Sequence, residues 1–447
     1  MDRIMLAGTS SGCGKTTVTL ALLSALRERE IRLCSFKCGP DYIDPIFHRE
    51  LLGVRTRNLD PFFSDGEQLR HALAESSDSD LALIEGVMGY YDGIAATSKA
   101  SSYEVSKLTE TPVILVLRPD GMCTSAAAIM RGFKSYKKDS RIVGVVFSCL
   151  NEKLYPYMKQ LAEDSGLRPL GFLPKREELI IPSRHLGLVS DFSKADMQRK
   201  LELLGELAEK YIDLAAVLEL AHSAVPLSGG DAPEPIPQSG IKIAVARDEA
   251  FCFIYEENLD ALRNQGCELL FFSPLEDSAL PDDASALYLP GGYPELYARR
   301  LSENTSMLAS IKRAVEGGLP TIAECGGFMY LHRRLDDYPM ANVIPARAYK
   351  TDSLKRFGYI TLRSSRDSLI AKADESIPCH EFHYYDSTDC GEDFTAEKAG
   401  SKTVYPCANG SSTLYAGFPH LYFPARPQLA ARFAQSAAQY KVSQNER

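Results

Sequence analysis

The stretch Ile4-Met-Leu-Ala-Gly8-Thr-Ser-Ser-Gly12-Cys-Gly14-Lys15-Thr16-Thr17-Val18 decides the fold of the first half of this chain. Its apolar beginning predicts a short buried strand, its glycine-rich centre a sharp turn, and the apolar spacing after it a helix. This order directs backbone N–H groups and the positive end of a helix dipole at one small volume. We therefore predict a loop that holds the phosphates of ATP through Gly12, Gly14, Lys15, Thr16 and Thr17.

The loop departs from the strict P-loop pattern at Thr9, where that pattern has its first glycine and where this chain has Gly8 just before. Gly-Thr-x-x-Gly-x-Gly-Lys-Thr resembles the variant found in dethiobiotin synthetase and its relatives. That resemblance implies an enzyme that uses ATP to activate a carboxylate.

Composition limits the class of protein. The 447 residues, 45% of them hydrophobic, are enough for two ordinary domains, and no apolar run is long enough for a membrane span or a signal peptide. The eleven cysteines form no Cys-x-x-Cys pair, and the net charge of −9 offers no footprint for nucleic acid. We expect a cytoplasmic enzyme that acts on small molecules, binds neither nucleic acid nor membrane, and is a monomer or homodimer.

The first half alternates apolar β-rich runs with helical stretches, which is typical of a parallel sheet covered by helices. After the first strand, the expected strands are Ile31 to Lys37, Leu81 to Gly86, Pro112 to Leu117, Ile142 to Ser148 and Pro169 to Leu173. Residues 195–221 are expected to be helical and to end this domain. Ligands of such sheets bind at the carboxyl ends of the strands.

Acidic residues follow two of these strands. They stand in Lys37-Cys-Gly-Pro-Asp41-Tyr-Ile-Asp44-Pro and in Glu85-Gly-Val-Met-Gly-Tyr-Tyr-Asp92-Gly. We expect Asp41 and Glu85 to join Thr16 around Mg²⁺, with Asp44 and Asp92 in the same cluster or in the acceptor site. The alternative is that acidic residues before proline and glycine simply form turns.

A proline- and glycine-rich segment, 223–240, predicts a linker between domain 1–222 and domain 241–447. A second alternation follows, with expected strands Ile241 to Arg247, Glu268 to Ser273, Ala286 to Leu289 and Pro320 to Ala323. The fold class is therefore α/β, with two α/β domains.

The second domain contains Pro320-Thr-Ile-Ala-Glu-Cys325-Gly-Gly-Phe-Met-Tyr-Leu, a strand that leads into a cysteine and then a helix. This is the geometry of a nucleophile elbow, and we expect the helix N-terminus to favour the Cys325 thiolate. His420 is the best placed base, and Gly291-Gly292 could offer N–H groups to an oxyanion. Taken singly, a buried cysteine is usually inert and a Gly-Gly turn usually structural.

Taken together, these motifs resemble those of cobyrinic acid a,c-diamide synthases, of the cobyrinic branch of class I glutamine amidotransferases. The resemblance covers nearly the whole chain. Besides the motifs above, it rests on Asn58-Leu-Asp-Pro, Ala244-Val-Ala-Arg-Asp, Phe253-Ile-Tyr-Glu-Glu-Asn, Gly291-Gly-Tyr-Pro-Glu and His380-Glu-Phe-His383-Tyr. It implies a dethiobiotin synthetase-like domain and a flavodoxin-like glutaminase domain.

The resemblance also implies a reaction. Glutamine is cleaved at Cys325, ammonia travels to the synthetase site, and ATP with Mg²⁺ phosphorylates the a and c acetates of a tetrapyrrole polycarboxylate in turn. It places Asp41, Tyr42, Ile43 and Asp44 in the acceptor pocket. Substrate carboxylates could also meet the basic residues Arg184, His185, Arg347, Lys350, Lys355 and Arg356, although a solvated charged face is an equal reading.

The chain departs from the family pattern at three places. The segment Phe147-Ser148-Cys149 lacks the Asn that usually contacts the nucleotide base. Tyr422 stands where a second histidine often follows His420, and Cys379 stands where a glycine commonly precedes His-Glu-Phe-His. No third member of the Cys-His site emerges from the sequence. His380 and His383 could suggest a metal, but the other ligands are missing.

Other substrates and another class of function stay open. The macrocycle could be sirohydrochlorin, with or without nickel, or hydrogenobyrinic acid, and the order of a and c amidation is not determined. A P-loop switch ATPase with a glutaminase-like binding module is the alternative from another class, although no basic amphipathic tail is present.

Overall fold

The computed structural model describes residues 1–447 except 77, 180–193, 228–238 and 446–447. The chain forms two compact units, Met1–Ala232 and Pro233–Arg447, each with its own sheets and hydrophobic cores. Arg184, His185 and most of the expected linker lie outside the described residues.

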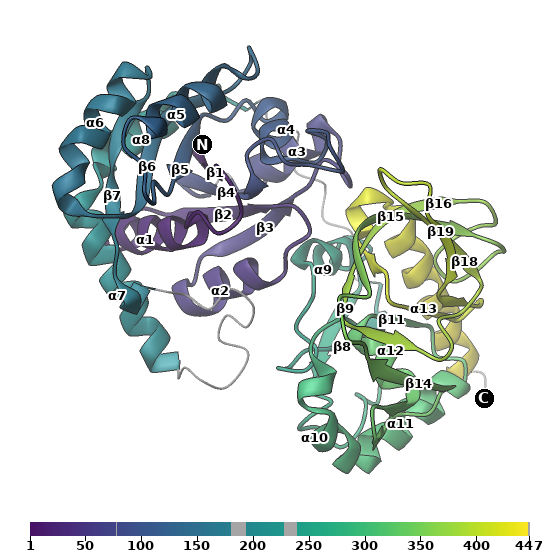
Figure 1. The fold of residues 1–447 in the computed structure, drawn as a ribbon. Helices are drawn as coiled ribbons and strands as arrows, with labels where there is room; N and C mark the ends of the chain where they lie inside the picture. The colour runs from purple at the N-terminus through teal and green to yellow at the C-terminus, as the bar shows by residue number, and fades with distance from the viewer. Residues whose placement is uncertain (77, 180–193, 228–238, 446–447) are drawn as a thin grey trace. The chain divides into compact units, whose positions relative to one another are not determined.

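The N-terminal unit contains a seven-stranded sheet in which every strand pair is parallel (Figure 1). The order β3-β2-β4-β1-β5-β6-β7 places the first strand at the centre, and all the strands expected in this half are present. Their bounds are β1 Asp2–Gly8, β2 Leu33–Cys38, β3 Arg55–Leu59, β4 Leu81–Gly89, β5 Val113–Leu117, β6 Ile142–Leu150 and β7 Arg168–Pro174.

Helices cover both faces of this sheet because its strands are apolar on both sides. One core packs against α1 Lys15–Glu28, α2 Ile43–Leu52, α7 Lys194–Tyr211 and α8 Leu214–His222. The other packs against α3 Gly66–Ala74, α4 Ser102–Leu108, α5 Ser125–Ser135 and α6 Tyr155–Asp164. Short 3-10 turns lie at η1 Glu152–Leu154 and η2 Glu177–Leu179. The expected helix over 195–221 is therefore two helices, α7 and α8.

Strand β3 was not predicted from the sequence. Its residues, Arg55-Thr-Arg-Asn-Leu59, alternate between exposed and buried positions, and the strand lies at the edge of the sheet. A polar edge strand has little of the apolar signal that marks the buried strands of a parallel sheet.

The C-terminal unit is built around a six-stranded sheet of order β20-β21-β11-β10-β8-β9, parallel except for the β20–β21 pair. Its four expected strands are present as β8, β9, β10 and β11, and two late strands complete it. The bounds are β8 Lys242–Ala246, β9 Glu268–Phe272, β10 Ala286–Leu289, β11 Thr321–Glu324, β20 Asn409–Gly410 and β21 Leu414–Gly417.

Two smaller sheets in this unit were not predicted. One has the order β13-β12-β14-β17, with strands β12 His332–Leu335, β13 Tyr338–Pro339, β14 Ile344–Lys350 and β17 Tyr385–Ser387. The other is antiparallel, of order β19-β18-β15-β16-β22, with strands β15 Arg356–Ser364, β16 Ser376–His383, β18 Phe394–Lys398, β19 Val404–Cys407 and β22 His420–Leu421. The antiparallel sheet carries His420.

Helices and cores flank the main sheet of this unit as well. One core packs against α10 Ala298–Glu303, α11 Thr305–Glu316 and α12 Gly326–Leu331. The other packs against α9 Glu256–Arg263, α13 Gln428–Asn445 and the antiparallel sheet. The 3-10 turns are η3 Pro294–Leu296 and η4 Phe423–Ala425.

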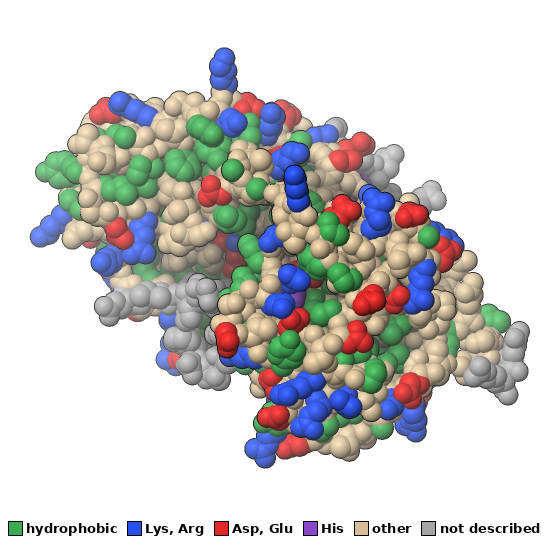
Figure 2. Space-filling view, turned by 45° about the vertical axis from the view of Figure 1, so that its right-hand side comes forward, with side chains coloured by type: hydrophobic (Ala, Val, Ile, Leu, Met, Phe, Trp, Pro, Cys, Tyr) green, Lys and Arg blue, Asp and Glu red, His purple; other side chains and the backbone are tan. Residues whose placement is uncertain are grey.

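The surface carries charges of both signs. On the face drawn in Figure 2, Lys and Arg side chains are interspersed with Asp and Glu. Among the described residues, no helix is long and apolar enough to cross a membrane.

Candidate active sites

The predicted phosphate-binding loop joins the central strand β1 to α1, which begins at Lys15. Gly14 caps this helix with a left-handed backbone, φ 94°, and an added Cβ there would lie 2.8 Å from the Cβ of Ser148. Ser148 in turn donates a hydrogen bond to the carbonyl of Cys13. Gly12 lies in the loop and Thr17 in the first turn of α1, so the five predicted residues all lie within residues 12–17, shortly after the end of β1.

Lys15 is held inside the loop. Its ammonium donates to the carbonyl of Ser10 at 3.1 Å and to that of Met88, at the end of β4, at 2.6 Å. Burial lowers the pKa of Lys15 below its usual value. The side chain is thereby fixed in the volume that the loop encloses.

Glu85 connects the loop to its neighbouring strand. The hydroxyl of Thr16 donates to Glu85 Oε1 at 2.6 Å, and the ammonium of Lys37 donates to the same oxygen at 2.9 Å. Glu85 Oε2 is buried and makes no hydrogen bond within the described part of the chain. Thr16 and Glu85, two of the residues predicted to hold Mg²⁺, are therefore in contact, and Glu85 Oε2, which lies 3.8 Å from Nε2 of His48, remains as an acceptor.

Lys37 on β2 compensates the buried acids. It donates a hydrogen bond to Asp44 and lies 3.9 Å from Asp41 Oδ2. Burial favours a neutral amine, but Asp44, Glu85 and Asp41 outweigh it and raise the pKa of Lys37 well above its usual value. The sequence motif contains Lys37, but its role was not predicted.

Asp41 and Asp44 lie in different surroundings. Asp41 Oδ1 accepts from the backbone N–H groups of Ile43 and Asp44, at 2.8 and 3.2 Å, so it closes the turn that opens α2. Burial, together with repulsion from Asp44, raises the pKa of Asp41 to about 6. Burial also opposes charge on Asp44, but Lys37 lowers the pKa of Asp44 below its usual value.

Tyr42 and Asp92 were also predicted as substrate residues. The Tyr42 side chain is 7% exposed and Ile43 is half-buried, whereas Asp92 is exposed. Asp92 Oδ2 accepts from the N–H of Gly89 at 3.0 Å, which stabilises the turn after β4. Asp92 thus makes the kind of contact expected if it simply forms a turn, which was the alternative interpretation of these acidic residues.

The second site is the elbow at Cys325. The cysteine follows β11 directly, has φ 45° and ψ −97°, and donates its N–H to the carbonyl of Gly417 at 2.8 Å. Positive φ is strained for any residue with a side chain and persists only where the surroundings enforce it. The predicted strand–cysteine–helix geometry is present.

The predicted Gly291-Gly292 loop lies against this elbow. A Cβ added to Gly326 would be 2.9 Å from the backbone N of Gly292, and one added to Gly291 would be 2.4 Å from Cε1 of His420. The glycines therefore allow the loop, the elbow and the histidine to approach one another closely. The structure brings the predicted nucleophile, base and oxyanion loop together.

His420 lies beside an acid that the sequence did not reveal. Its Nδ1 is 3.8 Å from Glu324 Oε2, and both side chains are almost fully buried. Glu324 immediately precedes Cys325, and adjacent residues in an extended strand point to opposite faces, so sequence spacing gave no signal for it.

The expected state of the thiol was wrong. Burial raises the pKa of Cys325 well above its usual value, and the carboxylates of Glu295 and Glu324 raise it further. Helix α12 has only six residues, and its dipole does not outweigh these effects. The raised pKa favours the neutral thiol, so Cys325 needs a base to act as a nucleophile.

Comparisons with known proteins identify both halves of the chain. Residues 4–189 match the CobQ/CobB/MinD/ParA nucleotide binding domain, and residues 242–427 match the CobB/CobQ-like glutamine amidotransferase domain. The cobyrinate a,c-diamide synthase of Listeria innocua is 37% identical over 443 residues, covering 96% of this chain and 98% of that protein. Those of Caldanaerobacter subterraneus and Priestia megaterium are each 36% identical and cover 98% and 100% of this chain, and 98% of their own lengths. This chain belongs to the cobyrinate a,c-diamide synthase family.

Solved structures resemble each half only distantly. Among them are PurLQS from Thermotoga maritima, 18% identical with a TM-score of 0.33 over 45% of this chain and 98% of that one, and the MinD cell division protein of Aquifex aeolicus, 15% identical with a TM-score of 0.32 over 51% and 100%. The assignment to the cobyrinate a,c-diamide synthase family therefore rests on the sequence relatives. As a member, the chain is a glutamine-dependent, amide-forming ligase with a nucleotide-binding domain.

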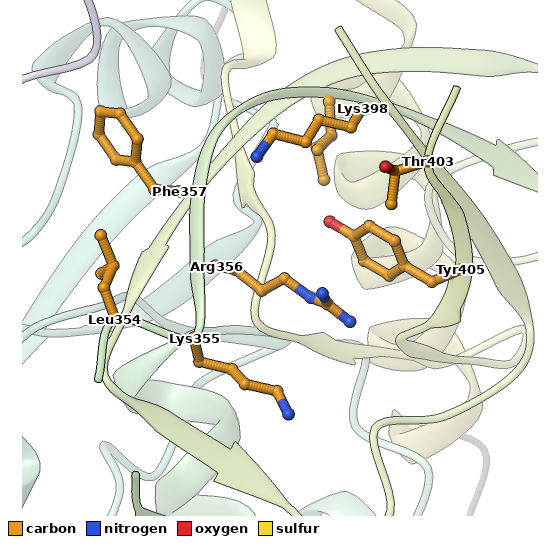
Figure 3. Close-up of a pocket in the computed structure, with 8 residues that line it drawn as sticks. Leu354, Lys355, Arg356, Phe357, Lys398, Thr403 and Tyr405 are labelled. Atoms are coloured by element: carbon orange, nitrogen blue, oxygen red, sulfur yellow. The ribbon is translucent and has the colours of Figure 1, made fainter. Parts of the chain in front are cut away.

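Two of the predicted basic residues of this synthase-family chain, Lys355 and Arg356, line a pocket together with Lys398 (Figure 3). Lys355 pairs with Asp386 at 2.5 Å, and the Arg356 guanidinium lies 4.0 Å from the ring centroid of Tyr405. Lys355 and Arg356 are thus held by contacts within the domain. This arrangement is compatible with a solvated charged face and with a site for substrate carboxylates.

The histidines of β16 are buried and neutral. Burial lowers the pKa of His380 well below its usual value and that of His383 to about 4. Within the described ranges, no three His, Cys, Asp or Glu side chains are grouped so that they could hold a metal ion.

Lys37 offers a test of the buried charge cluster. Lys37→Met should lower the free energy of unfolding of the N-terminal unit by about 3–5 kcal/mol, because removal of one member of a buried ion group leaves the others uncompensated. Denaturant unfolding followed by far-UV circular dichroism measures the change. Lys107→Met is the matched control, since its pair with Asp139 lies at the surface and should contribute little. Equal effects of the two substitutions would contradict this assignment.

Proposed function

We propose that this enzyme amidates the a and c acetate carboxylates of cobyrinic acid in cobalamin biosynthesis, in the cytoplasm, with ATP and glutamine. The observation that carries the proposal is one chain with both a phosphate-binding loop and a Cys325–His420–Gly291 glutaminase arrangement. Relatives with this name match it over nearly its whole length. The same reaction on sirohydrochlorin or hydrogenobyrinic acid is the second candidate.

The glutaminase half supplies ammonia. Cys325 attacks the carboxamide carbon of glutamine, and His420 accepts the thiol proton and passes it to the leaving ammonia. The N–H groups of Gly291 and Gly292 stabilise the oxyanion. Water then hydrolyses the glutamyl thioester to glutamate and returns the thiol.

The synthetase half activates the acceptor. A carboxylate is a poor electrophile until it is phosphorylated, and the loop residues hold the transferring phosphoryl group. Lys15 and the N–H groups around Gly12, Gly14 and Thr17 provide positive charge at that point. Ammonia from the other site then displaces phosphate from the acyl phosphate and forms the amide.

Mg²⁺ fits the residues beside the loop. The Thr16 hydroxyl and Glu85 meet there, and Glu85 Oε2 is a buried acceptor without a hydrogen bond in the described residues. Thr16, Glu85 and the partly buried Asp41 would hold the ion, and phosphate and water oxygens would complete its shell. When bound, Mg²⁺ neutralises charge on the phosphates.

The acceptor site is proposed at the start of α2. Asp41, Tyr42, Ile43 and Asp44 follow the carboxyl end of β2, where ligands of parallel sheets bind. Asp92 occupies the turn after the neighbouring strand β4. The fixed Lys37–Asp44 contact gives this loop a defined shape against which a polycarboxylate can bind.

The proposal predicts the product directly. Incubation of the purified enzyme with cobyrinic acid, ATP, Mg²⁺ and glutamine should give first a monoamide and then a diamide by mass spectrometry. Parallel reactions with sirohydrochlorin and hydrogenobyrinic acid identify the preferred ring. Glutamine hydrolysis and ATP hydrolysis without amidation of any of the three rings would contradict the proposal and favour a nucleotide-driven switch.

The division of labour between the halves predicts a chemical rescue. Cys325→Ser should reduce glutamine-supported amidation by roughly a thousandfold or more, because the nucleophile is lost. Activity with a high concentration of ammonium chloride should persist, since acceptor activation lies in the other domain. An unfolded variant is recognised by its circular dichroism, and a folded variant without rescue would show that the sites are wrongly assigned.

The phosphate-binding loop predicts the opposite pattern. Lys15→Met should reduce amidation by about 10²–10³-fold with glutamine and with ammonium alike, because Lys15 stabilises charge in phosphoryl transfer. Lys153→Met, at a surface position of the same unit, is the matched control. A loss confined to glutamine as donor would contradict the role of this loop.

A further inference from the structure

The imidazole of His420 is confined on several sides. In β22 it pairs with His380 of the antiparallel sheet, and the two rings are stacked with centroids 5.1 Å apart. Gly291 lies at its Cε1 edge, where any Cβ would clash. The ring therefore has little freedom to rotate, and its Nδ1 faces β11.

Glu324 is the group that Nδ1 faces. It is the last residue of β11, it is 1% exposed, and its Oε2 lies 3.8 Å from Nδ1. Oε1 accepts from the N–H of Leu421 at 3.2 Å, and Oε2 accepts from the hydroxyl of Tyr288 at 3.3 Å. Two donors from two strands thus fix the carboxylate beside the ring.

Asn258 extends this network and fixes the strand that carries His420. Its Nδ2 donates to the carbonyl of Leu421 at 2.9 Å and to Tyr288 at 3.3 Å, and its Oδ1 accepts from the N–H of Phe423 at 2.7 Å. Asn258 is fully buried. It holds the backbone, whereas Glu324 faces the imidazole.

We propose that Glu324, the residue just before the nucleophile, is a positioning residue that holds the Nδ1–H tautomer of His420 and stabilises its protonated form during glutamine cleavage. The inference rests on the proposed glutaminase function of Cys325 and His420. An acid with this role keeps Nε2 free to accept the thiol proton.

Several titratable groups surround His420. His380 and His383 of β16, whose pKa values are lowered by burial, and Tyr288, whose pKa is raised by burial, are neutral near pH 7. Glu381 of β16 lies beside His383, with its Oε1 4.0 Å from Nε2 of that ring, whereas Glu324 lies against Nδ1 of His420. Burial raises the pKa of Glu324 above its usual value, although His420 and the N–H of Leu421 oppose this rise. A positive charge on His420 therefore finds its counter-charge in Glu324.

The proton path balances with this assignment. The Cys325 sulfur forms a bond to the glutamine carboxamide carbon, and its proton passes to Nε2 of His420. The imidazolium then protonates the leaving nitrogen, the C–N bond breaks, and ammonia and a glutamyl thioester result. Glu324 keeps its charge and exchanges no proton in these steps.

The test separates this role from a structural one. Glu324→Gln keeps an oxygen for the N–H of Leu421 but removes the charge. We expect glutamine hydrolysis to fall roughly 10²-fold. Without the anion, the protonated form of the base loses its counter-charge, so the acidic limb of the kcat/KM profile should move to lower pH by about one unit or more.

Asn258→Ala is the matched control, because it loosens the same strand without changing the charge that faces the histidine. It should lower stability and activity but leave the position of the acidic limb unchanged. Ammonium-supported amidation measures in both variants whether the synthetase domain is intact. The proposal would be overturned if Glu324→Gln lowered kcat/KM without moving the acidic limb of its pH profile, which is the behaviour expected of Asn258→Ala.

A double-mutant cycle covers the case in which Glu324→Gln is too unstable to profile. In a His420→Ala background, Glu324→Asp should have no further effect on residual glutamine hydrolysis if Glu324 acts through His420. The proposal would be overturned if Glu324→Asp lowered glutamine hydrolysis in the His420→Ala background by the same factor as in the wild-type background. A failure of the proposed function is distinguishable, because wild-type protein would then not hydrolyse glutamine and Cys325→Ser would change nothing.

Discussion

A buried carboxylate is costly unless nearby groups compensate it, and each domain of this enzyme buries one glutamate in an inner strand of its parallel sheet. Glu85 is compensated by Thr16 and Lys37, and Glu324 by the Tyr288 hydroxyl and a backbone N–H. In both domains the compensating groups belong to elements that also carry functional residues. The need to satisfy the acid therefore positions the predicted phosphate-binding loop in one domain and His420, the proposed catalytic base, in the other.

The sequence predicted the parts of the structure that are local in the chain. The turn around Gly14 and the elbow at Cys325 each combine a buried strand, a small-residue turn and a helix within about a dozen residues, so their geometry is encoded in one stretch. The inner strands were predicted because both of their faces are apolar. The strands predicted from the sequence therefore include all strands of the two main sheets except the edge strand β3 and the short late strands β20 and β21.

The rest depends on contacts between distant segments. The antiparallel sheet that carries His420 joins strands β15, β16, β18, β19 and β22, whose mixed composition does not show which strand pairs with which. Lys37 and Glu324 were visible inside recognised motifs, but their partners are set by the packing of neighbouring strands. The state of the Cys325 thiol was predicted wrongly because burial, which no motif shows, outweighs the dipole of a short helix.

The position of Lys15 has a consequence for ligand choice. Its ammonium already donates hydrogen bonds to two carbonyl oxygens. A phosphate that binds the ammonium must replace these hydrogen bonds, so binding gains only the difference in free energy between the new and the old hydrogen bonds. A single phosphate group offers few other contacts to offset that exchange, whereas a triphosphate can engage several N–H groups of the loop at once. Free phosphate, which the proposed reaction releases, should therefore be a weak competitor, and the loop should select ligands by the length of their phosphate chain.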